Sequence, residues 1–136
     1  MSWDIIVLKF GSRSAKDLNA LIQSEETEAL RQSDSMGTRD EVRALISKHL
    51  HVDWNAVGSH GIRSAGTNAE TNTGYAIEIS LSEENSISSF VLHVHCGSST
   101  EDEILRALEK LRRPNNWALM DCSSGRFIEF EEHCKT

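Results

Sequence analysis

The sequence predicts an α+β fold in which an antiparallel sheet is covered on one face by two α-helices. Two runs of alternating apolar and polar residues, 75–81 and 87–96, are typical of paired strands, because successive strand side chains point to opposite faces. The segments behind Thr38 and Thr100 instead place apolar residues at helical spacing. With 136 residues the chain has the length of one ordinary domain, so we predict a single domain over 1–136.

The first 37 residues predict a buried strand followed by a long polar connection. Residues 3–10 form a compact apolar run rich in β-branched residues, which is typical of a buried strand. The region 11–37 is rich in Ser and Glu and predicts a long polar loop, in which Leu18, Leu21 and Ile22 have the spacing of one short helix. Connections of this length are functional or mobile.

Both predicted helices begin with a capping box. The hydroxyl of Thr38 can accept a hydrogen bond from the Glu41 amide while the Glu41 side chain accepts one from the Thr38 amide, and Thr100 repeats the pattern with Glu103. The first helix is expected over 39–49, and the second ends before Pro114. The apolar stripes behind the two boxes are Val42, Leu45, Ile46 and Leu50, then Ile104, Leu105, Leu108 and Leu111.

The remaining segments predict loops and two hairpins. Residues 58–74 contain many Gly, Asn, Thr and Ser and predict a loop. In the strand 87–96, Phe90, Leu92, Val94 and Cys96 share one face and Val91, His93 and His95 share the other. A final hairpin pairs 117–120 with 127–130 around the turn 121–125, and the tail 131–136 is expected to fray.

These assignments predict a hydrophobic core drawn from every element. Its members are expected to be Ile5, Val7, Val42, Leu45, Ile46, Ile77, Ile79, Phe90, Leu92, Val94, Leu105, Leu108, Leu111 and Leu119.

Charge and hydropathy exclude two classes of partner. The net charge is −7, the pI is about 5.3, and the basic residues alternate with acids, whereas a nucleic-acid binder carries a clustered basic footprint. No segment approaches the ~20 apolar residues of a membrane span, and the N-terminus lacks the pattern of a signal peptide. We therefore expect a cytoplasmic protein whose acidity favours a basic protein partner.

The three cysteines indicate no zinc site and no disulfide framework. They are Cys96, Cys122 and Cys134, which are odd in number and outside any C-x-x-C spacing. We expect all three to be reduced. Cys96 and Cys122 are interpreted as small buried side chains on strands.

His93 and His95 are the sharpest candidates for chemistry. On a strand their imidazoles face the same side, about 7 Å apart, which would let them share a metal ion with a third ligand such as His60 or Glu78. The alternative is that both are polar residues on the solvent face of a half-buried strand. We favour this alternative and expect no cofactor and no stoichiometric metal. Replacing both histidines with Gln should then leave stability near neutral pH almost unchanged.

Four segments resemble a family of small uncharacterised bacterial proteins with no known activity. They are the opening 1–7 (MSWDIIV), the helix start 37–42 (GTRDEV), the strand 90–94 (FVLHV) and the C-terminal stretch 118–127 (ALMDCSSGRF). The resemblance covers most of the chain apart from 11–36. It implies a bacterial cytoplasmic origin and assigns no site.

Three functions fit the sequence. The first is a non-catalytic protein-interaction module, of the kind that an immunity protein represents, whose acidic surface covers a basic partner. The second is an enzyme of unrecognised type, with or without a metal, that uses the 58–74 loop, His93, His95 and Asp121. The third is a protein that binds a small ligand at the same place. We favour the first, because no catalytic motif is present. The oligomeric state stays open.

Overall fold

The chain folds as an α+β structure built on one antiparallel sheet. The computed structural model describes residues 2–11, 14–25, 34–56, 59–68, 73–82, 86–96 and 101–129. Its strands are β1 (Ser2–Lys9), β2 (Asp53–Trp54), β3 (His60–Asn68), β4 (Thr73–Ser80), β5 (Ser89–Cys96), β6 (Trp117–Asp121) and β7 (Arg126–Phe127). They form a 7-stranded sheet in the order β2-β3-β4-β5-β1-β6-β7. Every neighbouring pair is antiparallel, so the N-terminal strand lies inside the sheet.

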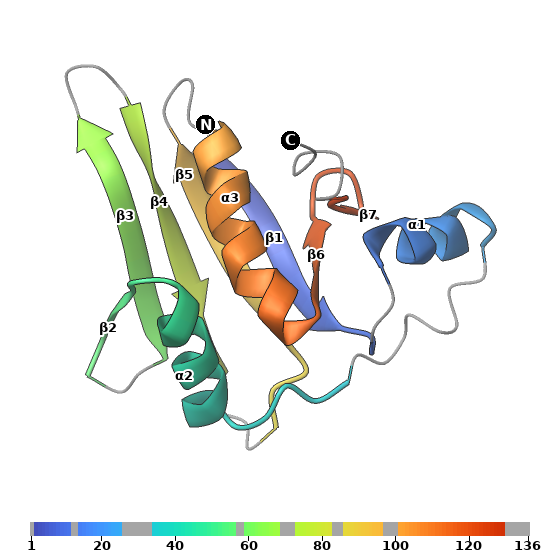
Figure 1. The fold of residues 1–136 in the computed structure, drawn as a ribbon, viewed down its shortest axis with the longest axis horizontal. Helices are drawn as coiled ribbons and strands as arrows, with labels where there is room; N and C mark the ends of the chain where they lie inside the picture. Colours follow the sequence, from blue (N-terminus) through green and yellow to red (C-terminus); the bar gives the residue numbers. More distant parts are fainter. Residues whose placement is uncertain are drawn as a thin grey trace.

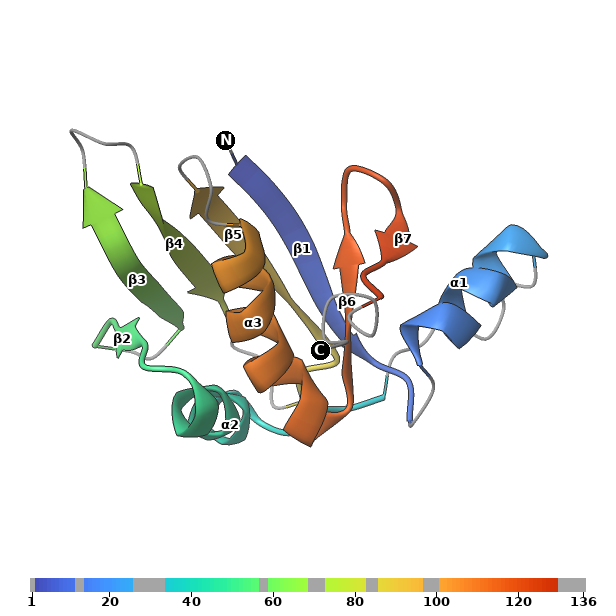
Figure 2. The same ribbon diagram turned by 45° about the horizontal axis from the view of Figure 1, so that its top comes forward.

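Two helices, α2 (Arg39–His49) and α3 (Glu101–Arg112), lie on the same side of this sheet (Figures 1 and 2). The predicted bounds of α2 are confirmed, and the predicted capping box is formed at its N-terminus. The Glu41 amide donates to Thr38 Oγ1 over 3.2 Å, and the Thr38 amide donates to Glu41 Oε1 over 3.1 Å. The second predicted cap, Thr100, lies outside the described residues. A 3-10 turn, η2 (Arg113–Asn115), contains Pro114 and follows α3 directly.

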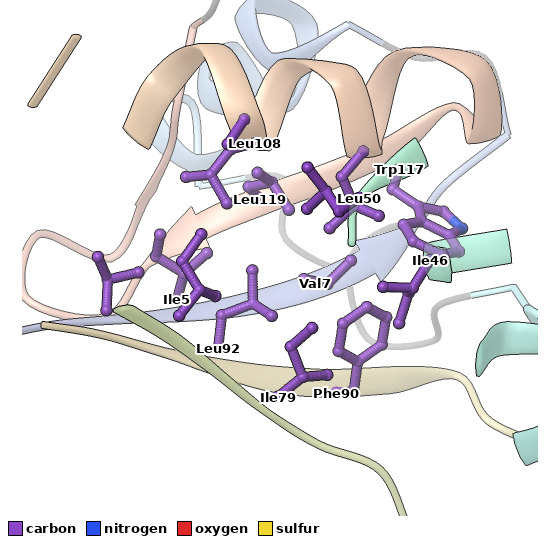
Figure 3. Close-up of a cluster of buried hydrophobic side chains, with 14 of the residues drawn as sticks. Ile5, Val7, Ile46, Leu50, Ile79, Phe90, Leu92, Leu108, Trp117 and Leu119 are labelled. Atoms are coloured by element: carbon purple, nitrogen blue, oxygen red, sulfur yellow. The ribbon is translucent and has the colours of Figure 1, made fainter. Parts of the chain in front are cut away.

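The main core lies between the sheet and these two helices. Figure 3 shows Leu108 of α3 above the side chains of Ile5, Leu92 and Leu119, which come from three neighbouring strands. Phe90 and Trp117 meet edge to face, with their ring centroids 5.4 Å apart. The predicted core is confirmed with one correction: Leu45 is only partly buried and packs against the edge of the core.

A third helix, α1 (Ala15–Gln23), lies beside β7 at the end of the sheet (Figure 1). It packs against Ala118 and Met120, which alternate with the core residues of β6 and therefore lie on the other face of the sheet. It lies in the region 11–37, where Leu18 marked a short helix. Leu18 is fully buried against a second apolar cluster that contains Phe10, Ala118 and Phe127. The prediction that two helices cover one face of the sheet is therefore confirmed for α2 and α3. The third helix, α1, covers one end of the opposite face. Residues 12–13 and 26–33 of this region lie outside the described part.

The predicted 58–74 loop is wrong over most of its length, because residues 60–68 form strand β3. Backbone pairing with β4 overrides the weak strand preference of Gly, Ala and Asn. Gly61 pairs with Trp54 of β2 and leaves room for the side chains of Val52 and Trp54 to pack against its backbone. A Cβ atom on residue 61 would lie 2.6 Å from Val52 Cγ1 and 2.7 Å from Trp54 Cε3.

The two predicted hairpins are present as β4–β5 and β6–β7, but the last strand covers 126–127 and not the predicted 127–130. The turn residues 83–85 and the tail 130–136 lie outside the described residues. Within the part of the chain that the structure describes, no helix has the length and apolar content needed to cross a membrane.

Candidate functional site

The sheet face opposite α2 and α3 carries most of the predicted site residues. The pairing register places Glu78 of β4 beside His93 of β5, and His93 beside Asp4 of β1. In the next register row, Ser80 lies beside Val91, and Val91 lies beside Ile6. Helix α1 packs over the β6–β7 end of this face. We call the part formed by these six residues, His60, Ile62 and His95 the open face.

His93 is held by a carboxylate from the strand next to it. Its Nδ1 lies 2.6 Å from Asp4 Oδ1, and the side chains are 44% and 56% exposed. Sequence reasoning missed Asp4, because it lies 89 positions before His93 and only the β1–β5 register brings the two together. The alternation within 87–96 did place His93 on the solvent face, and this prediction is confirmed.

His95 is held by a second carboxylate, on its other side. Its Nε2 lies 3.1 Å from Glu78 Oε2, and the His95 side chain is 55% exposed. His60 lies one strand further out, where its Nδ1 is 3.5 Å from Ser80 Oγ. The open face therefore holds two separate histidine–carboxylate pairs, with His60 near the second.

This arrangement lowers the pKa of Glu78. The hydrogen bond with His95 lowers the pKa, partial burial raises it, and positive charge on His95, His60 and His93 lowers it further. The carboxylate form is therefore stabilised in the folded protein relative to the unfolded chain.

Because the folded-state pKa is depressed, Glu78 contributes stability above its ordinary pKa of 4.5 and loses it as the pH falls through the lower folded value. We expect Glu78→Gln to reduce the unfolding midpoint in urea at pH values above 4.5, and the difference from wild type to shrink in more acidic solution. Glu25→Gln, at an exposed carboxylate beyond α1, is the control. A difference that stays constant down to acid pH would contradict the assignment.

The structure brings Glu78, one of the two expected third ligands, to His95, but it assembles no metal site in the described part of the chain. Among the described residues, no group of three or more His, Cys, Asp or Glu side chains is placed to hold a metal ion together. Each imidazole instead contacts its own carboxylate, and in the described part neither is hydrogen-bonded to a Ser, Thr or Cys side chain. The absence of metal in the purified protein stays a prediction.

Cys122 lies at the edge of this face, and the prediction that its side chain is buried is wrong. Strand β6 ends at Asp121, whose Oδ1 accepts hydrogen bonds from the amide and hydroxyl of Ser123, so residue 122 begins a turn and is exposed. Partial burial raises the pKa of Asp121, but hydrogen bonds from Ser123, Trp3 and Ser124 together outweigh it, so the pKa lies below its ordinary value. Desolvation and the nearby Asp4 and Asp121 raise the pKa of the Cys122 thiol, which disfavours the reactive thiolate. The Cys96 side chain and Cys134 lie outside the described part.

The open face thus combines a short apolar row, formed by Val91 and Ile6, with two carboxylates, those of Asp4 and Glu78, that are each hydrogen-bonded to a histidine. Comparison with known proteins adds no assignment: no family model, no curated protein and no solved structure matches this chain.

Proposed function

We propose that this chain is a non-catalytic cytoplasmic protein-interaction module that binds a basic protein partner through the open face. The observation that carries the proposal is the composition of this face, where an apolar row lies beside two carboxylates on a sheet surface that α2 and α3 leave uncovered. Nucleic acid is not the proposed ligand, because a net charge of −7 repels its phosphates.

The apolar part supplies contact area for a partner. Ile62 is 38% exposed, and no other large apolar side chain among the described residues is exposed to this extent. Val91 and Ile6 are half-buried and adjacent in the pairing register. Protein interfaces typically have such a small apolar centre and a polar rim, so the row supports binding of a folded surface.

The charged part supplies specificity. In the described part of the chain, the ion-pair partners of Asp4 and Glu78 are imidazoles, which carry a full positive charge only when they are protonated. A Lys or Arg side chain of the partner would take the place of the histidine beside the carboxylate and would bring a permanent positive charge. An Arg side chain can contact both carboxylate oxygens at once. Binding of this kind weakens as salt is added.

The alternative enzymatic reading has less support. It placed part of its site on a loop over 58–74, but residues 60–68 of that segment form a strand. The histidines that it used are each occupied by a carboxylate.

The proposal is tested by identifying the partner and mapping its contact. The wild-type chain is used as bait in its own cell extract, and each captured protein is purified and titrated against it at two salt concentrations. We expect a protein of basic pI that binds at a fixed stoichiometry and more weakly at high salt. The variant Asp4→Asn/Glu78→Gln should weaken binding at least ~10-fold, since hydrogen bonds to charged groups contribute about 1.5–3 kcal/mol each.

A matched control removes the same amount of charge elsewhere. Asp102→Asn/Glu25→Gln changes two exposed carboxylates outside the open face and should bind like wild type. Equal loss of affinity in both double variants would show that only overall charge matters. A partner that binds both variants as tightly as wild type, or a partner that is acidic, would contradict the proposal.

A further inference from the structure

A pocket on the opposite side of the molecule lies between the C-terminal end of α2, the middle of α3 and the start of β4. Its volume is about 240 Å³. The lining residues are His49, Leu50, His51, Tyr75, Glu103, Arg106, Ala107 and Lys110. The volume equals that of roughly eight molecules of liquid water, which suits a small metabolite better than a peptide.

The charge of this pocket is opposite to that of the whole chain. Arg106 and Lys110 lie one helical turn apart on α3, and both are exposed at the pocket. Within the described residues no ion pair involves either of them, whereas Arg112 and Arg113 of the same helical region both contact Glu109. Two cations therefore border the pocket, against one carboxylate, that of Glu103.

The wall of the pocket contains a buried tyrosine, Tyr75, whose side chain has no hydrogen-bond partner among the described residues. Tyr75 is only 5% exposed, and no hydrogen bond to its side chain is found in the part of the chain that the structure describes. A buried phenolic hydroxyl usually has a hydrogen-bond partner, because leaving it unsatisfied costs about 1–3 kcal/mol. Since Tyr75 lines the pocket, a molecule bound there could accept that hydrogen bond.

From these two observations we infer that the pocket binds a small organic anion, such as a carboxylate or a phosphate ester. Arg106 and Lys110 contact the anionic group, the Tyr75 hydroxyl donates a hydrogen bond to it, and Leu50 and Ala107 contact the apolar part of the molecule. The C-terminal end of α2 carries about half a negative charge, which opposes an anion. The two full positive charges on α3 exceed this effect.

The test uses phenyl phosphate, benzoate and inorganic phosphate as probes, with the neutral benzamide as a control of similar shape. Each is titrated into the full-length ¹⁵N-labelled chain at constant ionic strength while the amide shifts of Leu50 and Ala107 are followed. We expect saturable shifts with at least one anion and none with benzamide. Binding of phenyl phosphate alone identifies a phosphate ester site, and binding of benzoate alone identifies a carboxylate site.

Three variants locate the contact. Arg106→Gln should weaken the anion that binds at least ~10-fold, as expected for loss of a charge-assisted hydrogen bond. Tyr75→Phe should weaken it several-fold and leave the fold intact, because the ring stays in place. Lys48→Gln removes an exposed cation that does not line the pocket and should leave affinity unchanged. The inference is overturned if no anion gives saturable shifts, if benzamide binds equally well, or if Arg106→Gln and Lys48→Gln have the same effect.

Discussion

Leu108→Ala is expected to reduce the free energy of unfolding by about 2–5 kcal/mol, because it removes most of a fully buried side chain beneath α3. Figure 3 shows Leu108 directed from α3 toward the sheet, above the side chains of β1, β5 and β6. The substitution leaves a cavity that these strands can close only in part, since both layers are held by backbone hydrogen bonds. Urea denaturation followed by circular dichroism measures the effect.

Leu45→Ala is the matched control for this experiment. Leu45 is also a helical leucine, but on α2, where it is only partly buried at the edge of the core. The change in helix propensity is the same in both variants, so the difference between them reports burial. We expect Leu45→Ala to cost clearly less than Leu108→Ala. Equal costs would show that α3 does not cover the sheet as described.

Asn19→Ala is expected to reduce the free energy of unfolding by about 2–4 kcal/mol, because it leaves two buried backbone groups without partners. Asn19 is 7% exposed and is the buried polar side chain of the described residues. Its Nδ2 donates to the Phe127 carbonyl over 2.9 Å and to Glu129 Oε2 over 3.3 Å, and its Oδ1 accepts from the Phe127 amide over 2.8 Å. The amide side chain therefore pairs with β7 as a neighbouring strand would, and it attaches α1 to the sheet.

The control is an asparagine with the same number of hydrogen bonds in an exposed turn. Asn55 Oδ1 accepts from the amides of Ser59 and His60, and Nδ2 lies 3.4 Å from Ser59 Oγ. Water can replace these bonds, so Asn55→Ala should cost under about 1 kcal/mol. In Asn19→Ala the Phe127 amide should also exchange with deuterium faster. If both substitutions reduced the free energy of unfolding equally, burial of the Asn19 hydrogen bonds would not be the source of their stabilising effect.

The sequence predicted correctly those helices and strands that are determined by residues close to one another in the chain. The start of helix α2 was predicted correctly because its capping box, Thr38 and Glu41, consists of residues that are close in sequence. The β4–β5 hairpin followed from alternation, and this alternation also placed His93 on the open face.

Features that depend on distant contacts could not be predicted. Strand β3 has residues of low strand preference and is stabilised by pairing with β4 and by the close approach of Trp54 at Gly61. The attachment of α1 depends on bonds between Asn19 and Phe127, 108 positions apart. The partner of His93 likewise comes from β1, and the pocket requires α2 and α3 to be adjacent.

The central claim is that the open face contacts a protein partner, and site-specific photocrosslinking in the native cell tests it most directly. A benzophenone amino acid replaces Ile62 on the open face in one variant and Ala44, exposed on α2, in the other. The account predicts one discrete crosslinked product from position 62, containing a basic protein, and no such product from position 44. The same product from both positions, or a product from position 44 alone, would contradict the claim.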